Sequence, residues 1–103
     1  MPSLISVAKK NDIACGKALS VAVGARRVAL FNVDGKFFAI EDQCTHAGAS
    51  LAEGTLAGTV VTCPWHGATF DVATGAVLSA PAFENVATYK VQVQGEDVQI
   101  ETP

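Results

Sequence analysis

The chain has 103 residues, of which 50% are hydrophobic and 17% are charged, and its formal net charge is −3. This length fits one domain, residues 1–103, and leaves no room for a catalytic domain beside a cofactor domain. The chain lacks the basic footprint that a sequence-independent nucleic-acid binder needs, and no stretch approaches the roughly 18 apolar residues of a membrane span.

Short apolar segments separated by glycine and aspartate predict strands along most of the chain. In chain order, we expect strands at residues 4–7, 18–23, 28–33, 37–40, 59–62, 68–72, 76–78, 89–94 and 98–101. Asp34-Gly35 between two apolar runs is a hairpin signal, and the alternation in 89–94 and 98–101 predicts a terminal hairpin with one solvated face. Because no window of 11 residues shows a helical period, the expected fold class is all-β, a small antiparallel β sandwich or barrel.

Residues 42–82 differ from their flanks. They hold both histidines, two of the three cysteines and five of the nine glycines. We interpret this segment as a loop-rich insert carried by the β scaffold.

Charge is unevenly spread along the chain. Six of the seven basic side chains lie within residues 1–36, whereas eight of the ten acidic ones lie within residues 37–103. An acidic second half indicates either a basic partner surface or simply a solvated surface.

Two segments of the insert each offer one thiol and one imidazole: Cys44-Thr45-His46 and Cys63-Pro64-Trp65-His66. Gly48 and Gly67 follow the histidines closely and give each loop freedom to turn tightly. A set of two cysteines and two histidines suits a tetrahedral zinc ion, or a [2Fe–2S] cluster with the cysteines on one iron and the histidines on the other. The common zinc finger keeps its cysteines together, so the alternation of cysteine and histidine here favours the cluster.

The segments Cys44-Thr45-His46-Ala47-Gly48 and Cys63-Pro64-Trp65-His66-Gly67 resemble the paired boxes of Rieske iron–sulfur proteins. Further matching positions are Leu51, Gly54, Phe70-Asp71, Thr74-Gly75 and Ala80-Pro81-Ala82. The resemblance implies one [2Fe–2S] cluster, with Cys44 and Cys63 on the buried iron and His46 and His66 on the outer iron. It also implies a small antiparallel β base with a cluster-binding subdomain, in agreement with the expected strands and insert.

Several positions depart from the pattern of one branch of the family and indicate which kind of Rieske protein the chain resembles. Rieske subunits of cytochrome bc complexes have two further loop cysteines joined as a disulfide, and the matching positions here are Ala49 and Trp65. Those subunits also have a serine and a tyrosine that donate hydrogen bonds to the cluster sulfurs, where this chain has Ala68 and Phe70. Without these donors we expect a reduction potential at the low end of the Rieske range, about −150 to −100 mV. The chain thus resembles the soluble Rieske ferredoxins of bacterial aromatic-ring dioxygenases.

The resemblance implies an electron-transfer component rather than an enzyme. One electron at a time would pass from a flavin-containing, NAD(P)H-dependent ferredoxin reductase to a terminal aromatic-ring dioxygenase. With both histidines assigned to the cluster, none is left for a non-haem iron site or a serine triad. The absence of a G-x-G-x-x-G fingerprint argues against a dinucleotide site.

Two alternatives stay open: the small Rieske subunit of a nitrite reductase or other oxidoreductase complex, and a zinc-stabilised interaction module. The N-terminus lacks the pattern of a signal peptide, so we expect a cytoplasmic protein. We also expect a monomer that binds neither nucleic acid nor membrane.

Several other residues carry weaker interpretations. Trp65 is interpreted as an apolar cap over the second loop, with a docking contact as the alternative, and Pro81 as part of the shield over the cluster. Cys15 is interpreted as a small structural residue rather than a reactive thiol. Phe70 is expected in the core under the loops, and Asp42 either orients the first loop or is polar loop surface.

Overall fold

A computed structural model describes residues 3–23, 26–43, 50–64, 67–79 and 85–102. Every strand pairing among these residues is antiparallel, which confirms the all-β class. The strands are β1 (Ser3–Lys9), β2 (Ala18–Val23), β3 (Arg26–Val33), β4 (Lys36–Glu41), β5 (Thr55–Ala57), β6 (Val60–Thr62), β7 (Thr69–Asp71), β8 (Val77–Ser79), β9 (Thr88–Tyr89), β10 (Val91–Gln94) and β11 (Asp97–Thr102). Two 3₁₀ turns are η1 (Lys10–Asp12) and η2 (Leu51–Glu53). Within the described ranges, no helix is long and apolar enough to cross a membrane.

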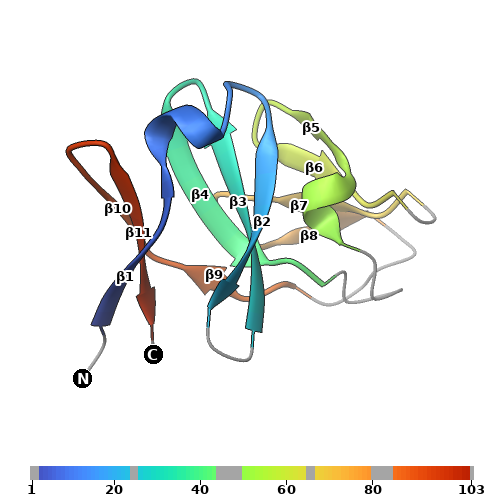
Figure 1. Ribbon diagram of the computed structural model, residues 1–103. Coiled ribbons are helices and arrows are strands. Elements are labelled where there is room, and N and C mark those ends of the chain that lie inside the picture. Colours follow the sequence, from blue (N-terminus) through green and yellow to red (C-terminus); the bar gives the residue numbers. More distant parts are fainter. Residues whose placement is uncertain (1–2, 24–25, 44–49, 65–66, 80–84, 103) are drawn as a thin grey trace.

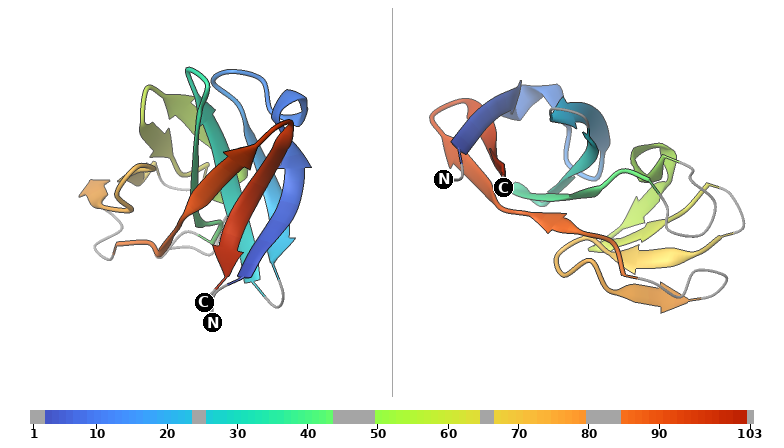
Figure 2. Two further views of the ribbon diagram at one scale, coloured as in Figure 1. Left: turned by 90° about the vertical axis from the view of Figure 1, so that its left-hand side faces the viewer. Right: turned by 90° about the horizontal axis from the view of Figure 1, so that it is seen from below.

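The strands form three sheets arranged one after another across the molecule (Figure 1). The terminal sheet has the order β1-β11-β10, the middle sheet β2-β3-β4-β9, and the insert sheet β5-β6-β7-β8. The terminal sheet lies at the left of Figure 1 and the insert sheet at the right, and the view from below shows the same separation (Figure 2). The insert sheet falls within the predicted insert, residues 42–82.

The central strand of the middle sheet, β3, is buried on both faces. Along β3, Val28 and Leu30 belong to one core cluster, and Ala29 and Phe31 belong to another. The terminal core lies on the side of Val98 and Ile100 and contains Ile13, Val23, Val28, Leu30, Ala39, Val98 and Ile100. The insert core contains Ala29, Phe31, Ile40, Leu51, Val61, Cys63, Ala68, Phe70, Val72 and Val86. The continuous apolar run of β3 is the pattern of a strand that is covered on both sides.

The strand predicted at residues 89–94 is wrong in one respect, because the structure has two strands there. β9 pairs with β4 in the middle sheet, whereas β10 pairs with β11 in the terminal sheet. The chain changes sheets at Lys90, whose carbonyl oxygen accepts a hydrogen bond from the Glu101 backbone at 3.0 Å. Side-chain alternation continues through this point, so the period alone could not reveal the change of partner.

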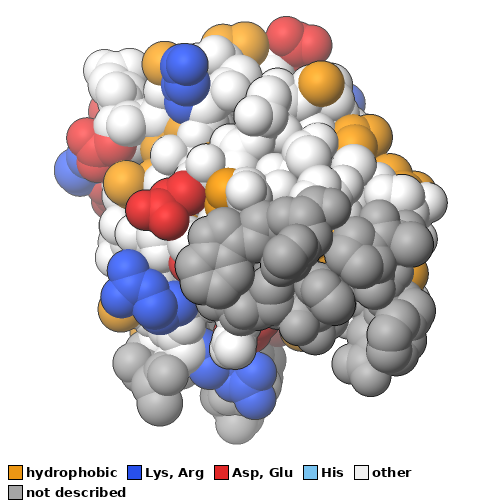
Figure 3. Space-filling model, turned by 90° about the vertical axis from the view of Figure 1, so that its right-hand side faces the viewer, with side chains coloured by type: hydrophobic (Ala, Val, Ile, Leu, Met, Phe, Trp, Pro, Cys, Tyr) orange, Lys and Arg blue, Asp and Glu red, His pale blue; other side chains and the backbone are white. Residues whose placement is uncertain are grey.

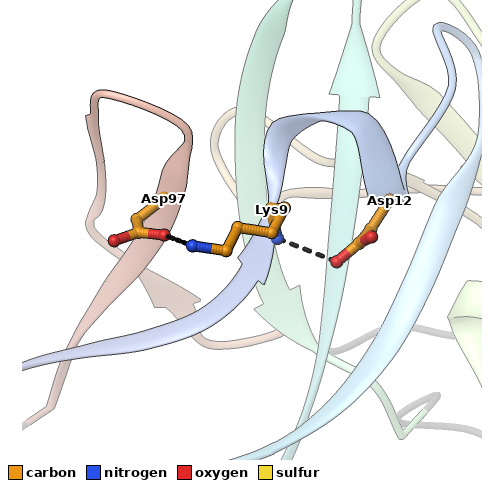
Figure 4. Close-up of polar contacts among 3 residues, drawn as sticks. All are labelled: Lys9, Asp12 and Asp97. Carbon is orange, nitrogen blue, oxygen red and sulfur yellow. Dashed lines mark hydrogen bonds and ion pairs between the residues drawn. The ribbon is translucent and has the colours of Figure 1, made fainter.

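Ion pairs in the described ranges join the basic first part of the chain to the acidic later part. Lys9 pairs with Asp97, and the backbone N–H of Lys9 donates to Asp12 at 2.9 Å (Figure 4). Arg26 lies 3.5 Å from Glu41. The hydrogen bond and the charge of Asp97 raise the pKa of Lys9 above its ordinary value. Some of the acidic side chains in the later part of the chain are therefore paired with basic side chains of the first part.

Candidate metal centre

The second ligand box lies in a hairpin loop between β6 and β7. Cys63 directly follows β6, and its backbone N–H donates to the carbonyl oxygen of Ala68 at 2.7 Å, which closes the loop. Gly67 has a φ of 74°, a left-handed conformation that glycine adopts without steric cost. Cys63 is only 2% exposed and belongs to the insert core with Ala68 and Phe70. The second loop thus has a buried cysteine at its start.

The first ligand box follows β4, and the structure describes the base of its loop on both sides. The backbone N–H of Asp42 donates to the carbonyl of Arg27 at 3.0 Å, and the N–H of Leu51 donates to the carbonyl of Asp42 at 2.6 Å. Gln43 and Ser50 form an antiparallel bridge. The two ends of the first loop are therefore fastened to each other and to β3.

The bases of the two loops are neighbours. A Cβ atom on Gly54 would lie 2.1 Å from the carbonyl oxygen of Thr62, so the backbones meet where only glycine fits. Thr62 immediately precedes Cys63, and it pairs with Thr55 across the insert sheet. The chain that leaves the first loop therefore runs beside the start of the second.

A buried carboxylate stands at the base of the first loop. Asp42 is 3% exposed, and its oxygens accept hydrogen bonds from Ser50 Oγ at 2.8 and 2.9 Å, from the Ala52 N–H at 3.0 Å and from Ser20 Oγ at 3.1 Å. The guanidinium of Arg27 donates to the same Ser20 hydroxyl at 3.2 Å. This burial rules out the interpretation of Asp42 as polar loop surface.

Ser20 and Ser50 are partners of Asp42 that the sequence patterns did not indicate. Ser20 is the one hydroxyl residue in the otherwise apolar strand β2, Ala18–Val23. A lone polar residue in such a strand is a signal that its side chain has a buried partner. Ser50 carried no comparable signal, because a serine in a loop is common.

Of the four predicted ligands, the structure describes Cys63. The predicted residues that lie outside the described ranges are Cys44, His46, Trp65, His66 and Pro81. The expectation that Phe70 packs in the core is confirmed, because its side chain is fully buried in the insert core beside Cys63 and Ala68. Cys15 is exposed at the surface, and its thiol lies 3.5 Å from Asp34 Oδ1.

The described residues fit an iron–sulfur cluster. A thiolate on the inner iron needs a site screened from water, and Cys63 lies in the insert core beside fully buried Ala68 and Phe70. The sequence supplies a second cysteine and two histidines in loops whose bases adjoin. Neither Ala68 nor Phe70 carries a hydroxyl that could donate to a cluster sulfur.

The face on the side of the insert sheet carries charges of both signs. Its described part shows basic side chains toward the lower left of the view and acidic ones above them (Figure 3). Among the described residues, Arg26 pairs with Glu41, and Glu41 also accepts a hydrogen bond from the Tyr89 hydroxyl at 2.8 Å. The described part of this face is therefore mixed in charge and shows no continuous acidic field.

The sequence matches the Rieske [2Fe-2S] domain family over residues 3–90. The chain belongs to this family, and its cofactor is one Rieske-type [2Fe–2S] cluster. Because the chain belongs to this family, its site holds the iron–sulfur cluster rather than a zinc ion.

Relatives within the family share a common role. The biphenyl dioxygenase ferredoxin subunit of Pseudomonas sp. (strain KKS102) is 46% identical over 92 residues, which cover 88% of this chain and 84% of the relative. The ferredoxin of Sphingomonas yanoikuyae B1 has a TM-score of 0.92 at 32% identity, over 98% of this chain and 100% of that one. A chain from the complex of reduced oxygenase and oxidized ferredoxin in carbazole 1,9a-dioxygenase has a TM-score of 0.89 at 39% identity, over 94% and 91% of the two chains. These findings confirm the predicted resemblance to dioxygenase ferredoxins.

The nitrite reductase alternative has weaker support. Two solved structures assigned to nitrite reductase small subunits are 22% and 21% identical to this chain, with TM-scores of 0.82 and 0.89. At this identity the likeness shows the fold alone.

Proposed function

We propose that this chain carries one electron at a time from a flavin-containing, NAD(P)H-dependent ferredoxin reductase to a terminal aromatic-ring dioxygenase. The observation that carries the proposal is the contact between the two loop bases at Gly54 and Thr62. It supports convergence of the two boxes, each with one cysteine and one histidine, on one centre. The bound cluster supplies a centre that accepts and releases a single electron.

The proposed ligands are Cys44 and Cys63 on the inner iron and His46 and His66 on the outer iron. The burial of Cys63 supports the inner assignment, because the thiolates of a Rieske cluster bind the iron away from solvent. Neutral imidazoles leave the centre less negative than four thiolates would, so it accepts an electron more readily than an all-cysteine ferredoxin.

The protein's own part is to hold the loops and shield the sulfur side. The apolar side chains of Ala68 and Phe70 exclude water next to Cys63 without offering a hydroxyl donor. Because donors to sulfur stabilise the more negative reduced state, this environment supports a potential at the low end of the Rieske range.

A carrier must bind two partners in turn and release each of them. We therefore expect each interface to be small, below about 1,200 Å² in total, and the carrier to be a monomer. A cytoplasmic location would keep Cys44 and Cys63 reduced and available to iron.

The ligand assignment is tested on purified protein by iron and sulfide analysis and by the EPR spectrum after reduction. We expect two iron atoms per chain and a Rieske-type spectrum. Cys63→Ser and His46→Ala should lose this cluster, whereas Cys15→Ser should keep it, since Cys15 is exposed and outside the set. A normal cluster in His46→Ala would refute the assignment of that ligand.

The partner assignment is tested by reconstitution. The chain is mixed with NADH and the reductase and terminal oxygenase of a biphenyl dioxygenase system, and dihydroxylated product is measured. We expect product formation to depend on this chain and to stop with Cys63→Ser. Turnover that is no faster with the chain than without it, while the cluster is intact, would contradict the carrier role in such a system.

A further inference from the structure

We propose that Asp42 is a positioning residue that fixes the first cluster loop, and that its carboxylate thereby sets how firmly the cluster is held and how readily it is reduced. This inference rests on the proposed ligand set, because Cys44 and His46 lie in the loop that Asp42 precedes.

The carboxylate joins three separate elements. Ser20 donates from β2, Ser50 from the far end of the loop, and the Ala52 N–H from η2. Each donor lies within 3.1 Å of a carboxylate oxygen. The loop base is therefore tied to the scaffold strand and to the turn after the loop through one side chain.

The main chain of Asp42 makes two further hydrogen bonds at the base of the loop. The Asp42 N–H donates to Arg27 and its carbonyl accepts from Leu51, so residue 42 uses both its main-chain and its side-chain polar groups. Buried polar groups of this kind are costly to leave without partners. Removing the carboxylate would leave the Ser50 hydroxyl and the Ala52 N–H without their acceptor.

The two cluster loops are held differently. The second loop closes through a backbone hydrogen bond between Cys63 and Ala68 and through apolar packing. The first loop also has a backbone hydrogen bond at its base, from the Leu51 N–H to the Asp42 carbonyl, but three further bonds, from Ser20, Ser50 and Ala52, all end on one carboxylate. Substitution of Asp42 therefore removes these three bonds from the first loop while the second loop keeps its closure, so we expect its effect to fall on the proposed ligands Cys44 and His46.

The position of the carboxylate also affects the charge near the cluster. Asp42 is buried and precedes the proposed ligand Cys44 by two residues in the sequence. A buried carboxylate charge near a redox centre opposes the addition of an electron, because the interior screens it weakly. The nearest described cation in the network, Arg27, reaches Asp42 only through the Ser20 hydroxyl.

The test compares wild type with Asp42→Asn, Asp42→Ala and Ser50→Ala, each reconstituted with iron and sulfide. The readouts are the rate of iron release to a chelator, the reduction potential and the EPR g-values. We expect iron release about tenfold faster in Asp42→Ala, with Asp42→Asn intermediate, because an amide oxygen still accepts from Ala52. The potential should rise in Asp42→Asn, since the change removes a buried charge.

Two controls separate positioning from general effects. Glu53→Gln removes an exposed carboxylate from η2, where solvent screens the charge, so its potential should stay close to that of wild type. Val98→Ala lowers stability through the terminal core, far from the loops, and should keep the wild-type rate of iron release. If Asp42→Ala does not fold, Asp42→Asn and Ser50→Ala carry the comparison.

Two results would overturn the inference, and they differ. If Asp42→Asn and Ser50→Ala lower the melting temperature but match wild type in iron release, potential and g-values, the role of Asp42 is only structural and the carrier proposal stands. If wild type itself assembles no [2Fe–2S] cluster, the proposed function fails and the positioning role fails with it.

Discussion

The backbone N–H of Cys63 and the carbonyl oxygen of Ala68 are joined by a hydrogen bond of 2.7 Å, which brings the two ends of the second ligand loop together. Both residues are buried, so the loop leaves the insert core and returns to it within six residues. Ala68 therefore stands opposite the proposed ligand Cys63, at the position where cytochrome bc-type Rieske proteins carry a serine.

Ala68→Ser should raise the reduction potential. We expect a hydroxyl at this buried position to donate a hydrogen bond to a sulfur atom of the bound cluster. Such a bond would stabilise the reduced state by about 1 kcal/mol, which corresponds to roughly 40 mV for a one-electron couple. Voltammetry of the two proteins measures the change directly. Thr69→Val, which alters a hydroxyl on the neighbouring half-buried residue without adding one at Ala68, is the control and should leave the potential near that of wild type.

Gly75→Ala should destabilise the fold strongly. Gly75 has a φ of 77°, and a Cβ there would lie 2.4 Å from the carbonyl oxygen of Val86. Its own carbonyl also accepts from the Val86 N–H at 2.9 Å, so the backbones cannot separate without losing that bond. We expect a loss of about 2–4 kcal/mol in the free energy of unfolding, measured by urea titration.

Gly58→Ala is the matched control for this change. Gly58 also has a positive φ, 60°, but a Cβ there would meet nothing within 4 Å. Only the conformational cost of about 1–2 kcal/mol should remain. Equal losses in the two variants would show that the contact with Val86 is unimportant.

Local chemistry accounts for the parts of the fold that the sequence analysis predicted well. Asp34 and Gly35 have φ values of 51° and 88°, and these positive angles are what a tight hairpin turn requires. The apolar run of β3 reflects burial on both faces, so its strand could be predicted without knowing its neighbours. The paired Cys and His boxes were equally local, because each ligand pair spans at most four residues.

Features that depend on distant strands could not be predicted in this way. Ser20 and Asp42 are 22 residues apart and meet only because β2 and β4 flank β3. The split between β9 and β10 at Lys90 depends on which sheet offers a free edge, and the alternating sequence there suits either partner. Propensity and periodicity describe a strand's faces, whereas its neighbours follow from the packing of the whole chain.

Tyr89→Phe should change the stability of the protein at alkaline pH. The Tyr89 hydroxyl donates to Glu41 at 2.8 Å, and burial, followed by the effect of Glu41, raises the pKa of Tyr89 above its ordinary value of 10.0. The unfolded chain releases this proton at lower pH than the folded protein does. The contribution of Tyr89 to stability is therefore complete below about pH 10 and is lost as the pH rises through the folded pKa.

Urea unfolding of wild type and Tyr89→Phe between about pH 8 and pH 11 tests this sign. The stability of wild type should fall more steeply above pH 10 than that of the variant. Lys9 also has a raised pKa and contributes to the same alkaline decline, but it is unchanged in both proteins. Parallel curves would mean that the phenol does not take part in the linkage.

Leu51→Ala and Ile100→Ala should separate the two cores by function. Both side chains are fully buried, Leu51 in the insert core and Ile100 in the terminal core. Each truncation leaves a cavity and should cost about 2–5 kcal/mol in the free energy of unfolding.

Leu51, however, directly follows the first loop and packs in the same core as Cys63, so its loss should also speed iron release to a chelator. Ile100 lies behind the middle sheet, so Ile100→Ala should release iron at the wild-type rate under conditions where it remains folded. If both variants released iron equally fast at matched stability, iron release would depend on global unfolding. Damage to the terminal core would then affect the cluster loops as much as damage to the insert core.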